Sequence, residues 1–197
     1  MQLTGWLVRV VSMQRDAERT RRQILAAAME EFAERGIAGA RVDRIATVAG
    51  CNKAMLYAYY GSKDGLFDAV FTVYVEMYLA QVGFDAEDLP TYAGRVFDYF
   101  ERNPGHLRLA TWYRLERPQS TQLEAVIAVN AERLSALQAA QSAGKVSPDF
   151  SPVALLSLIQ SIATSWSTMN PEYKAAQPGR AQRRQAVVRA VELLLHR

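Results

Sequence analysis

Apolar residues recur at three- and four-residue intervals through most of this chain, which is the pattern of amphipathic helices rather than of strands. The first such stripe contains Ile24, Ala28 and Phe32. It predicts a helix over residues 16–35, which Gly36 is expected to end. Almost no alternating β-branched segments lie between the turn signals. The pattern therefore predicts an all-α protein.

The same periodicity predicts six helices after residue 61. Their expected ranges are 62–78, 89–103, 106–117, 121–144, 151–170 and 178–197. Ser62 is expected to cap the first of them and Asp88 the second, and Thr121 with Glu124 is expected to form a capping box for the fourth. The residues of the fourth that are expected to point inward are Leu123, Val126, Ile127, Leu134 and Leu137. The helix from residue 62 is too long and too aromatic for a small module alone, so it should continue into a second domain.

The last two predicted helices indicate a subunit interface. Residues 151–170 carry no charge, but nine of them are Ser, Thr, Gln or Asn, which makes the segment too polar to insert into a membrane. A helix that is apolar on two sides fits burial between its own domain and a partner subunit. Residues 178–197 present a wide apolar stripe, with Arg180, Arg183 and Arg184 expected opposite it. Two such helices from each of two subunits would form a four-helix interface.

Residues 41–66 have the spacing of a helix-turn-helix. Ile45 and Ala46 give the first short helix a small apolar face, Gly50 supplies a left-handed turn residue, and Leu56 lies six residues later. The residues left on the outer faces of the second helix are Asn52, Lys53, Ala54, Met55, Tyr57 and Tyr59. A helix in this position enters the major groove of DNA.

The pattern continues as Leu56-Tyr57-x-Tyr59-Tyr60-x-Ser62-Lys63-x-x-Leu66 and closely resembles the TetR (tetracycline repressor) family. Tyr60 replaces the usual Phe, Cys51 replaces Val, Asn52 replaces Ser, and Arg41 stands where a capping Ser or Thr is usual. The resemblance implies a ligand-responsive transcriptional regulator, most often a repressor. It also implies a homodimer, formed through the last two helices, that binds a palindromic operator and is released by a small molecule.

We therefore expect three parts along the chain. Residues 16–63 should form a DNA-binding domain of three helices, and residues 64–197 a larger helical domain for effector binding and dimerisation. Residues 1–15 have two interpretations: a poorly ordered leader, or an arm whose arginines reach the minor groove.

The DNA contacts divide into two expected kinds. Tyr57, Tyr59 and Lys63 suit phosphate oxygens, because Tyr and Lys commonly donate to them and the start of a helix favours anions. Ala54 and Met55 suit thymine methyl groups, with Lys53 as a further base contact. The full expected set is Arg41, Arg44, Asn52, Lys53, Ala54, Met55, Tyr57, Tyr59 and Lys63. The alternative for the tyrosines is an ordinary exposed aromatic surface.

A cluster of aromatic residues in the larger domain suggests an effector site. The expected lining is Tyr74, Tyr78, Phe97, Phe100, Trp112, Tyr113, Gln160 and Trp166. Aromatic walls with few charges favour a hydrophobic or aromatic ligand. The alternative for each of these residues is a place in the core, because aromatic residues at helical spacing most often lie there.

Composition narrows the possible functions. Residues 1–63 hold ten Lys and Arg against six Asp and Glu, so the basic excess lies with the helix-turn-helix, as phosphate binding requires. One cysteine cannot form an internal disulfide, which favours a cytoplasmic protein. No metal cluster, cofactor loop or catalytic constellation is visible, so neither a cofactor nor an enzyme activity is expected. Two alternatives stay open: a DNA-binding regulator without an effector, and a small enzyme or metabolite-binding protein.

Overall fold

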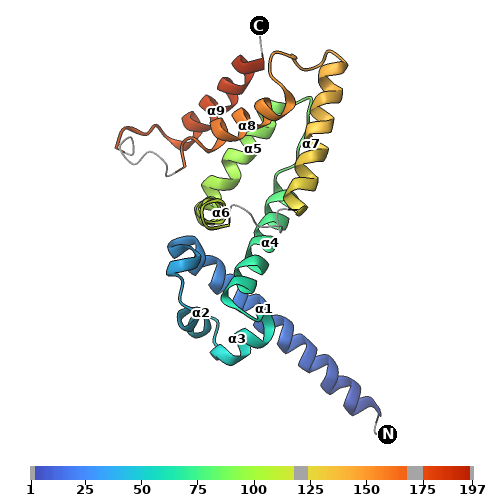
Figure 1. Ribbon diagram of the computed structural model, residues 1–197, viewed down its shortest axis with the longest axis vertical. Coiled ribbons are helices and arrows are strands. Elements are labelled where there is room, and N and C mark those ends of the chain that lie inside the picture. Colours follow the sequence, from blue (N-terminus) through green and yellow to red (C-terminus); the bar gives the residue numbers. More distant parts are fainter. Residues whose placement is uncertain (1–2, 118–123, 168–174, 196–197) are drawn as a thin grey trace. The chain divides into compact units, whose positions relative to one another are not determined.

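The computed structural model describes residues 3–117, 124–167 and 175–195, and over these ranges the regular structure is helical (Figure 1). The helices are α1 (Leu3–Gly39), α2 (Val42–Val48), α3 (Lys53–Tyr60), α4 (Lys63–Gln81), α5 (Leu89–Arg102), α6 (Pro104–Glu116), α7 (Glu124–Ser142), α8 (Pro152–Thr164) and α9 (Arg180–Leu195). The predicted all-α class is confirmed.

Helix α1 is longer than the sequence pattern predicts, because it begins at Leu3 and not near residue 16. The segment expected to be a leader or an arm is thus helical from Leu3 onward. Gly36 has φ 66° and ψ −175°, so it interrupts the helix as predicted. A Cβ atom at Gly36 would meet the carboxylate of Glu116 and would lie 2.9 Å from the ring of Trp112, so both the dihedral angle and the available space require glycine.

The chain divides into two compact units. Unit 1 contains α1, α2, α3, the part of α4 up to Tyr74 and the part of α6 from Arg108 onward. Unit 2 contains the rest of α4 and α6 together with α5, α7, α8 and α9. Both α4 and α6 therefore contribute residues to each unit, whereas the sequence pattern placed a single boundary after residue 63.

The core of unit 1 is aromatic. Phe32 of α1 meets Phe67 of α4 edge to face with ring centroids 5.0 Å apart. Tyr113 of α6 stacks on Phe71 at 3.7 Å. Such ring pairs add to the free energy of burying their apolar area. They hold α1, α4 and the end of α6 together in the unit that also contains the short helices α2 and α3.

Helix α5 is the centre of unit 2 and packs against both α8 and α9. Asp98 of α5 pairs with Arg180 and with Arg184 of α9, and Glu101 pairs with Arg183 at 2.7 Å. The prediction that these arginines lie away from the packed side of the last helix is thus wrong. Because Asp98 and Glu101 are three residues apart, they lie on one face of α5 and attract the arginines to it.

Two details of the predicted helices also need correction. The uncharged helix ends at Thr164 and not at residue 170, and residues 165–167 form a turn and a bend. Ile127 is exposed, since the inner face of α7 runs instead through buried Arg133 and Leu137.

Thr121, Leu123 and residues 168–170 lie outside the described residues. The caps at Asp88 and Ser62 are confirmed by bonds from the amides of Thr91 and Gly65.

Candidate nucleic-acid interface

The recognition helix α3 is fixed at its start by a turn and a cap. Gly50 has φ 67°, a left-handed conformation that glycine adopts without strain. The side chain of Asn52 then accepts the amide hydrogen of Met55 at 2.7 Å. Asn is among the residues that cap helices most strongly, so the replacement of the family's Ser preserves the cap. The side-chain oxygen of Asn52 therefore caps α3, although Asn52 was expected to contact DNA.

One side of α3 is buried and the other is exposed, as predicted. Leu56 is completely buried and anchors α3 on its neighbours. Lys53, Ala54, Met55 and Tyr57 are exposed, with 40% of Met55 and 38% of Tyr57 accessible. Such large accessible apolar surfaces on a short, well-anchored helix are available to base edges and thymine methyl groups.

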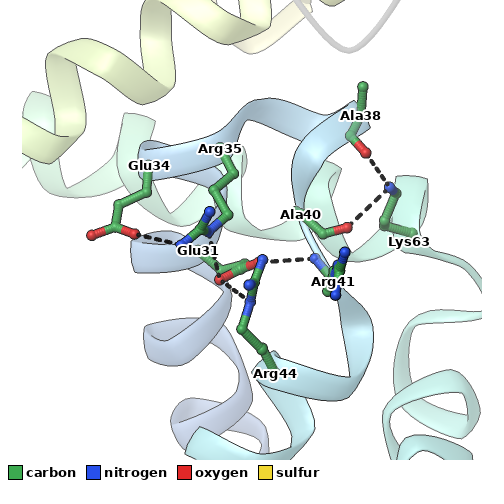
Figure 2. Close-up of polar contacts among 8 residues, drawn as sticks. All are labelled: Glu31, Glu34, Arg35, Ala38, Ala40, Arg41, Arg44 and Lys63. Atoms are coloured by element: carbon green, nitrogen blue, oxygen red, sulfur yellow. Dashed lines mark hydrogen bonds and ion pairs between the residues drawn. The ribbon is translucent and has the colours of Figure 1, made fainter.

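A carboxylate that the sequence pattern did not single out organises the start of α2 (Figure 2). Glu31 of α1 accepts the backbone amide of Arg41 at 2.9 Å. It also accepts Nε and Nη2 of Arg44, at 3.0 and 2.7 Å. Arg41 has no side-chain cap of its own. Glu31 thus satisfies, from α1, the amide of the N-cap residue of α2, as the carboxylate of a capping box does. It also ties α2 to α1.

The ionisation of Glu31 follows from these contacts. Burial acts to raise the pKa of Glu31, but the hydrogen bonds from Arg44 and from the Arg41 amide outweigh burial and lower it. Only 11% of the side chain is accessible, so solvent screens this charge weakly. The carboxylate is therefore charged at neutral pH and holds the Arg44 guanidinium in a fixed fork.

These bonds change the expected roles of two arginines. The fork of Arg44 is directed at Glu31, so its main role in this structure is to position α2. Arg41 is bound through its backbone, and its side chain is exposed. Both were expected at the DNA surface, and of the two only Arg44 has its guanidinium paired with Glu31.

Lys63 fastens the loop between α1 and α2 to the start of α4 (Figure 2). Its ammonium group donates to the carbonyl oxygens of Ala38 and Ala40, at 3.4 and 3.2 Å. An ammonium has three donors, so one is left for a phosphate after these two bonds. The expected phosphate contact at Lys63 is thus compatible with a positioning role that the sequence did not predict.

Two further contacts attach α3 to its surroundings. Lys53 lies 3.1 Å from Asp43 of α2, and both side chains are exposed, so water competes strongly with this pair. The hydroxyl of Tyr60 donates to the carbonyl of Arg21 at 3.3 Å, and the Arg21 guanidinium lies 5.9 Å from the Tyr60 ring. The hydroxyl that distinguishes Tyr60 from the family's Phe thus connects α3 to α1. Tyr59 is half-buried beside it, with ring centroids 6.2 Å apart.

The residues expected to line an effector site are divided between the units. Tyr74, Trp112 and Tyr113 belong to unit 1, where Phe71 lies between Tyr74 and Tyr113 at 5.4 and 3.7 Å. Tyr78, Phe97, Phe100, Gln160 and Trp166 belong to unit 2. There Tyr78 stacks on Phe100 at 5.7 Å, and Phe97 lies under Arg183. These contacts place several of the eight in aromatic cores, and the effector site stays a prediction.

Other kinds of site find no support in the part of the chain that the structure describes. There, no group of three or more His, Cys, Asp and Glu could hold a metal ion. No described helix is long and apolar enough to cross a membrane. Burial raises the pKa of the Cys51 thiol, which does not favour a reactive thiolate.

Comparisons with known proteins agree with this geometry. Residues 24–70 match the family model of bacterial regulatory proteins, tetR family, and residues 88–192 match that of the tetracyclin repressor-like C-terminal domain. The HTH-type transcriptional repressor SCO4008 of Streptomyces coelicolor is 34% identical over 165 residues, which cover 81% of this chain and 84% of that protein. The HTH-type transcriptional repressor NicS of Pseudomonas putida is 38% identical over 96 residues, 45% of each chain.

A solved structure extends the similarity to the whole fold. The crystal structure of SCO4942 from Streptomyces coelicolor superposes with a TM-score of 0.83 at 42% sequence identity. The match covers 90% of this chain and 99% of that chain. The similarity therefore includes the larger helical domain as well as the DNA-binding helices.

Proposed function

Because this chain belongs to the TetR family of bacterial regulatory proteins, we propose that it is a transcriptional repressor released from its operator by a small molecule. It binds a near-palindromic site as a homodimer. The chain is a DNA-binding regulator and not an enzyme, which leaves a regulator without an effector as the alternative. The observation that carries the proposal is the exposed outer face of α3 on a helix-turn-helix held rigidly by Glu31 and Lys63.

The residues of this surface have distinct roles in the proposal. Ala54 and Met55 read base edges through apolar contact, and Lys53 reaches a base once it leaves Asp43. Tyr57, Tyr59 and the third donor of Lys63 bind phosphates and fix the register of α3 on the duplex. Arg41 adds a phosphate contact from the start of α2. Arg44 is kept as a positioning residue.

A dimer is needed for specificity. One short recognition helix reads too few base pairs to select a genomic site, and a two-fold dimer doubles the site. Helices α8 and α9 support a dimer interface, because Val153 and Leu158 of α8 and Leu193 of α9 are exposed in the single chain. We assign the interface to residues 151–170 and 178–197.

The release mechanism uses the helices that contribute residues to both units. Helix α4 carries Lys63 in unit 1 and Tyr78 in unit 2. A ligand that favours another position of the far end of α4 therefore changes the position of the recognition helix. A tenfold loss of operator affinity needs a preference of only about 1.4 kcal/mol for the non-binding state.

Selection of bound DNA from a random pool with the full chain tests the proposal. We expect recovery of an inverted repeat whose half-sites lie about one helical turn apart, or a simple multiple of it. A matched selection with Met55→Ala should recover a repeat with altered base preference at the same spacing. Recovery of fragments without a shared sequence would contradict a specific repressor.

A further inference from the structure

An arginine occupies a core position of α7 in unit 2. Arg133 lies one helical turn before Leu137 and two before Ala140, and both of these are buried. Only 7% of Arg133 is accessible. A charged side chain at such a position is costly unless another group compensates for the water it has lost.

Aromatic rings surround the guanidinium. It lies 5.9 Å from the ring of Tyr78, 5.5 Å from Phe84 and 5.6 Å from Tyr92. Phe84 and Tyr92 meet edge to face at 5.0 Å. The faces of such rings attract a cation, but they do not accept its N–H hydrogens as a carboxylate does. We call Arg133, Tyr78, Phe84 and Tyr92 the arginine box.

Within the described part of the chain, the guanidinium has little hydrogen bonding and no acid partner. Its one bond to a described residue runs from Nη1 to the hydroxyl of Tyr92, at 3.4 Å. No carboxylate of the described residues forms an ion pair with it. The neighbouring Glu132 is exposed, and Asp98, Glu101 and Glu87 each pair with another cation.

Another arginine of the same unit provides a direct contrast. Arg183 also lies over an aromatic ring, that of Phe97 at 5.7 Å. Its guanidinium is held by both oxygens of Glu101, each at 2.7 Å. The guanidinium of Arg183, which joins two helices, is thus paired with a carboxylate. The guanidinium of Arg133 is surrounded by aromatic rings instead, and no described carboxylate binds it.

The open fork keeps some exposure. Among the described residues, neither Nε nor Nη2 of Arg133 is a fully buried nitrogen without a hydrogen-bond partner. Since the one bond of Arg133 uses Nη1, both of these nitrogens keep some accessible surface although the residue is nearly buried. These two nitrogens form the edge of a guanidinium that binds a carboxylate through two parallel bonds.

We infer that the arginine box of unit 2 binds the carboxylate of a small, otherwise apolar acid, with Arg133 as its anchor. One guanidinium neutralises one negative charge, and the aromatic rings suit the hydrocarbon part of such a ligand, which favours a monocarboxylic acid over a multiply charged phosphate. The inference rests on the proposed function, because it assigns the chemical class of the effector. It adds an anionic group to the hydrophobic ligand that the aromatic residues alone suggest.

Pairs of small acids and their neutral amides test the anchor in the full chain. The probes are benzoate and benzamide, 2-naphthoate and 2-naphthamide, and octanoate and octanamide, titrated by calorimetry at pH 7.5. For at least one pair, we expect the acid to bind the wild type at least tenfold more tightly than the amide. Arg133→Met should reduce this preference below about threefold. Arg189→Met should retain it, because Arg189 is an exposed arginine of the same unit paired with Glu192.

The inference would be overturned if acid and amide bound equally in every pair, or if no acid bound. It would also be overturned if the preference for the acid were unchanged in Arg133→Met. Thermal unfolding without a probe gives a second test. We expect the unfolding midpoint of Arg133→Met to equal or exceed that of the wild type, because an unneutralised buried charge has been removed. A lower midpoint by several degrees would assign Arg133 to a structural role.

Operator binding separates this inference from the proposed function. Without a probe, Arg133→Met should bind the selected DNA as the wild type does. If both proteins bind DNA but no acid is preferred, the arginine box assignment fails and the repressor proposal stands. If the wild type recovers no specific DNA, the repressor proposal fails, and the titrations still decide whether Arg133 binds carboxylates.

Discussion

The carboxylate of Glu31 secures the start of α2 from another helix, α1. It satisfies the amide of Arg41, the N-cap residue, and also holds Arg44, so one nearly buried side chain connects two helices. The sequence pattern predicted the missing side-chain cap at Arg41 but not the bond from its amide to Glu31. A partner ten residues earlier in the chain becomes visible only when α1 and α2 are placed against each other.

Replacing Glu31 should destabilise the protein measurably. Glu31→Gln keeps one carbonyl acceptor but loses the charge that pairs with Arg44, so we expect the free energy of unfolding to fall by about 1–3 kcal/mol. Chemical denaturation at pH 7 measures the change. The control is Glu34→Gln, because Glu34 is exposed and lies 3.7 Å from Arg35. An equal effect of the two substitutions would contradict the role of Glu31.

The same variant tests the pH dependence. Because the folded pKa of Glu31 lies below its ordinary value of 4.5, the stability that its charge contributes is complete above pH 4.5. This contribution is lost as the pH falls through the lowered pKa. The difference in unfolding free energy between the wild type and Glu31→Gln should therefore shrink below pH 4.5, and a constant difference down to pH 3 would argue against the assignment.

Lys63 offers a second measurement at the scale of one residue. Lys63→Gln keeps a hydrogen-bond donor on this side chain but has no charge for a phosphate. We expect it to weaken binding to all DNA sequences alike and to reduce the slope of log affinity against log salt by about one. Met55→Ala should instead change base preference and leave the slope unchanged.

Affinity measured between 50 and 300 mM salt distinguishes these effects. Lys145→Ala is the control, since Lys145 pairs with Glu87 in unit 2. If the slope for Lys63→Gln equals those of the wild type and the control, Lys63 does not contact a phosphate.

At the scale of helices, the local signals predicted most elements and missed their tertiary partners. The turn at Gly50, the buried Leu56 and the caps at Ser62 and Asp88 depend on residues a few positions apart, and all are confirmed. The pairing of α9 arginines with α5 joins residues more than 80 positions apart. A helical stripe does not specify which distant helix attracts its charged face.

Gly36 gives an element-scale test of the junction between α1 and α2. Gly36→Ala forces alanine into φ 66° and brings its Cβ against Trp112, whereas Gly144→Ala at φ 72° meets nothing within 4 Å. Gly144→Ala should cost only the left-handed backbone penalty, about 1–2 kcal/mol. We expect Gly36→Ala to cost at least about 1 kcal/mol more, by the usual cost of overpacking. Equal losses in chemical denaturation would show that Trp112 does not restrict this position.

At the scale of the whole molecule, the proposed function needs two copies of the chain acting together. The exposed apolar side chains of α8 and α9 support an interface that a single chain does not bury, including Leu193 with 57% of its surface accessible. The uncharged composition of residues 151–170 indicated this from sequence alone. The arrangement of two recognition helices depends on subunit contacts that no local pattern encodes.

Disrupting the proposed interface should separate the subunits. Leu193→Glu places a charge on the α9 surface, so we expect a shift from dimer to monomer in sedimentation at micromolar concentration. Leu115→Glu is the matched control, because Leu115 is exposed on α6, in the part that belongs to unit 1. The control should remain dimeric. Dissociation by both variants, or by neither, would argue against the assigned interface.

In the proposed function, two subunits read one symmetric operator through α3. The stoichiometry and affinity of the full chain on the selected operator test this, compared with a duplex in which one half-site is scrambled. We expect two chains per intact operator, and a loss of affinity of at least a hundredfold when one half-site is scrambled. One chain per duplex, with affinity unchanged by scrambling, would contradict it.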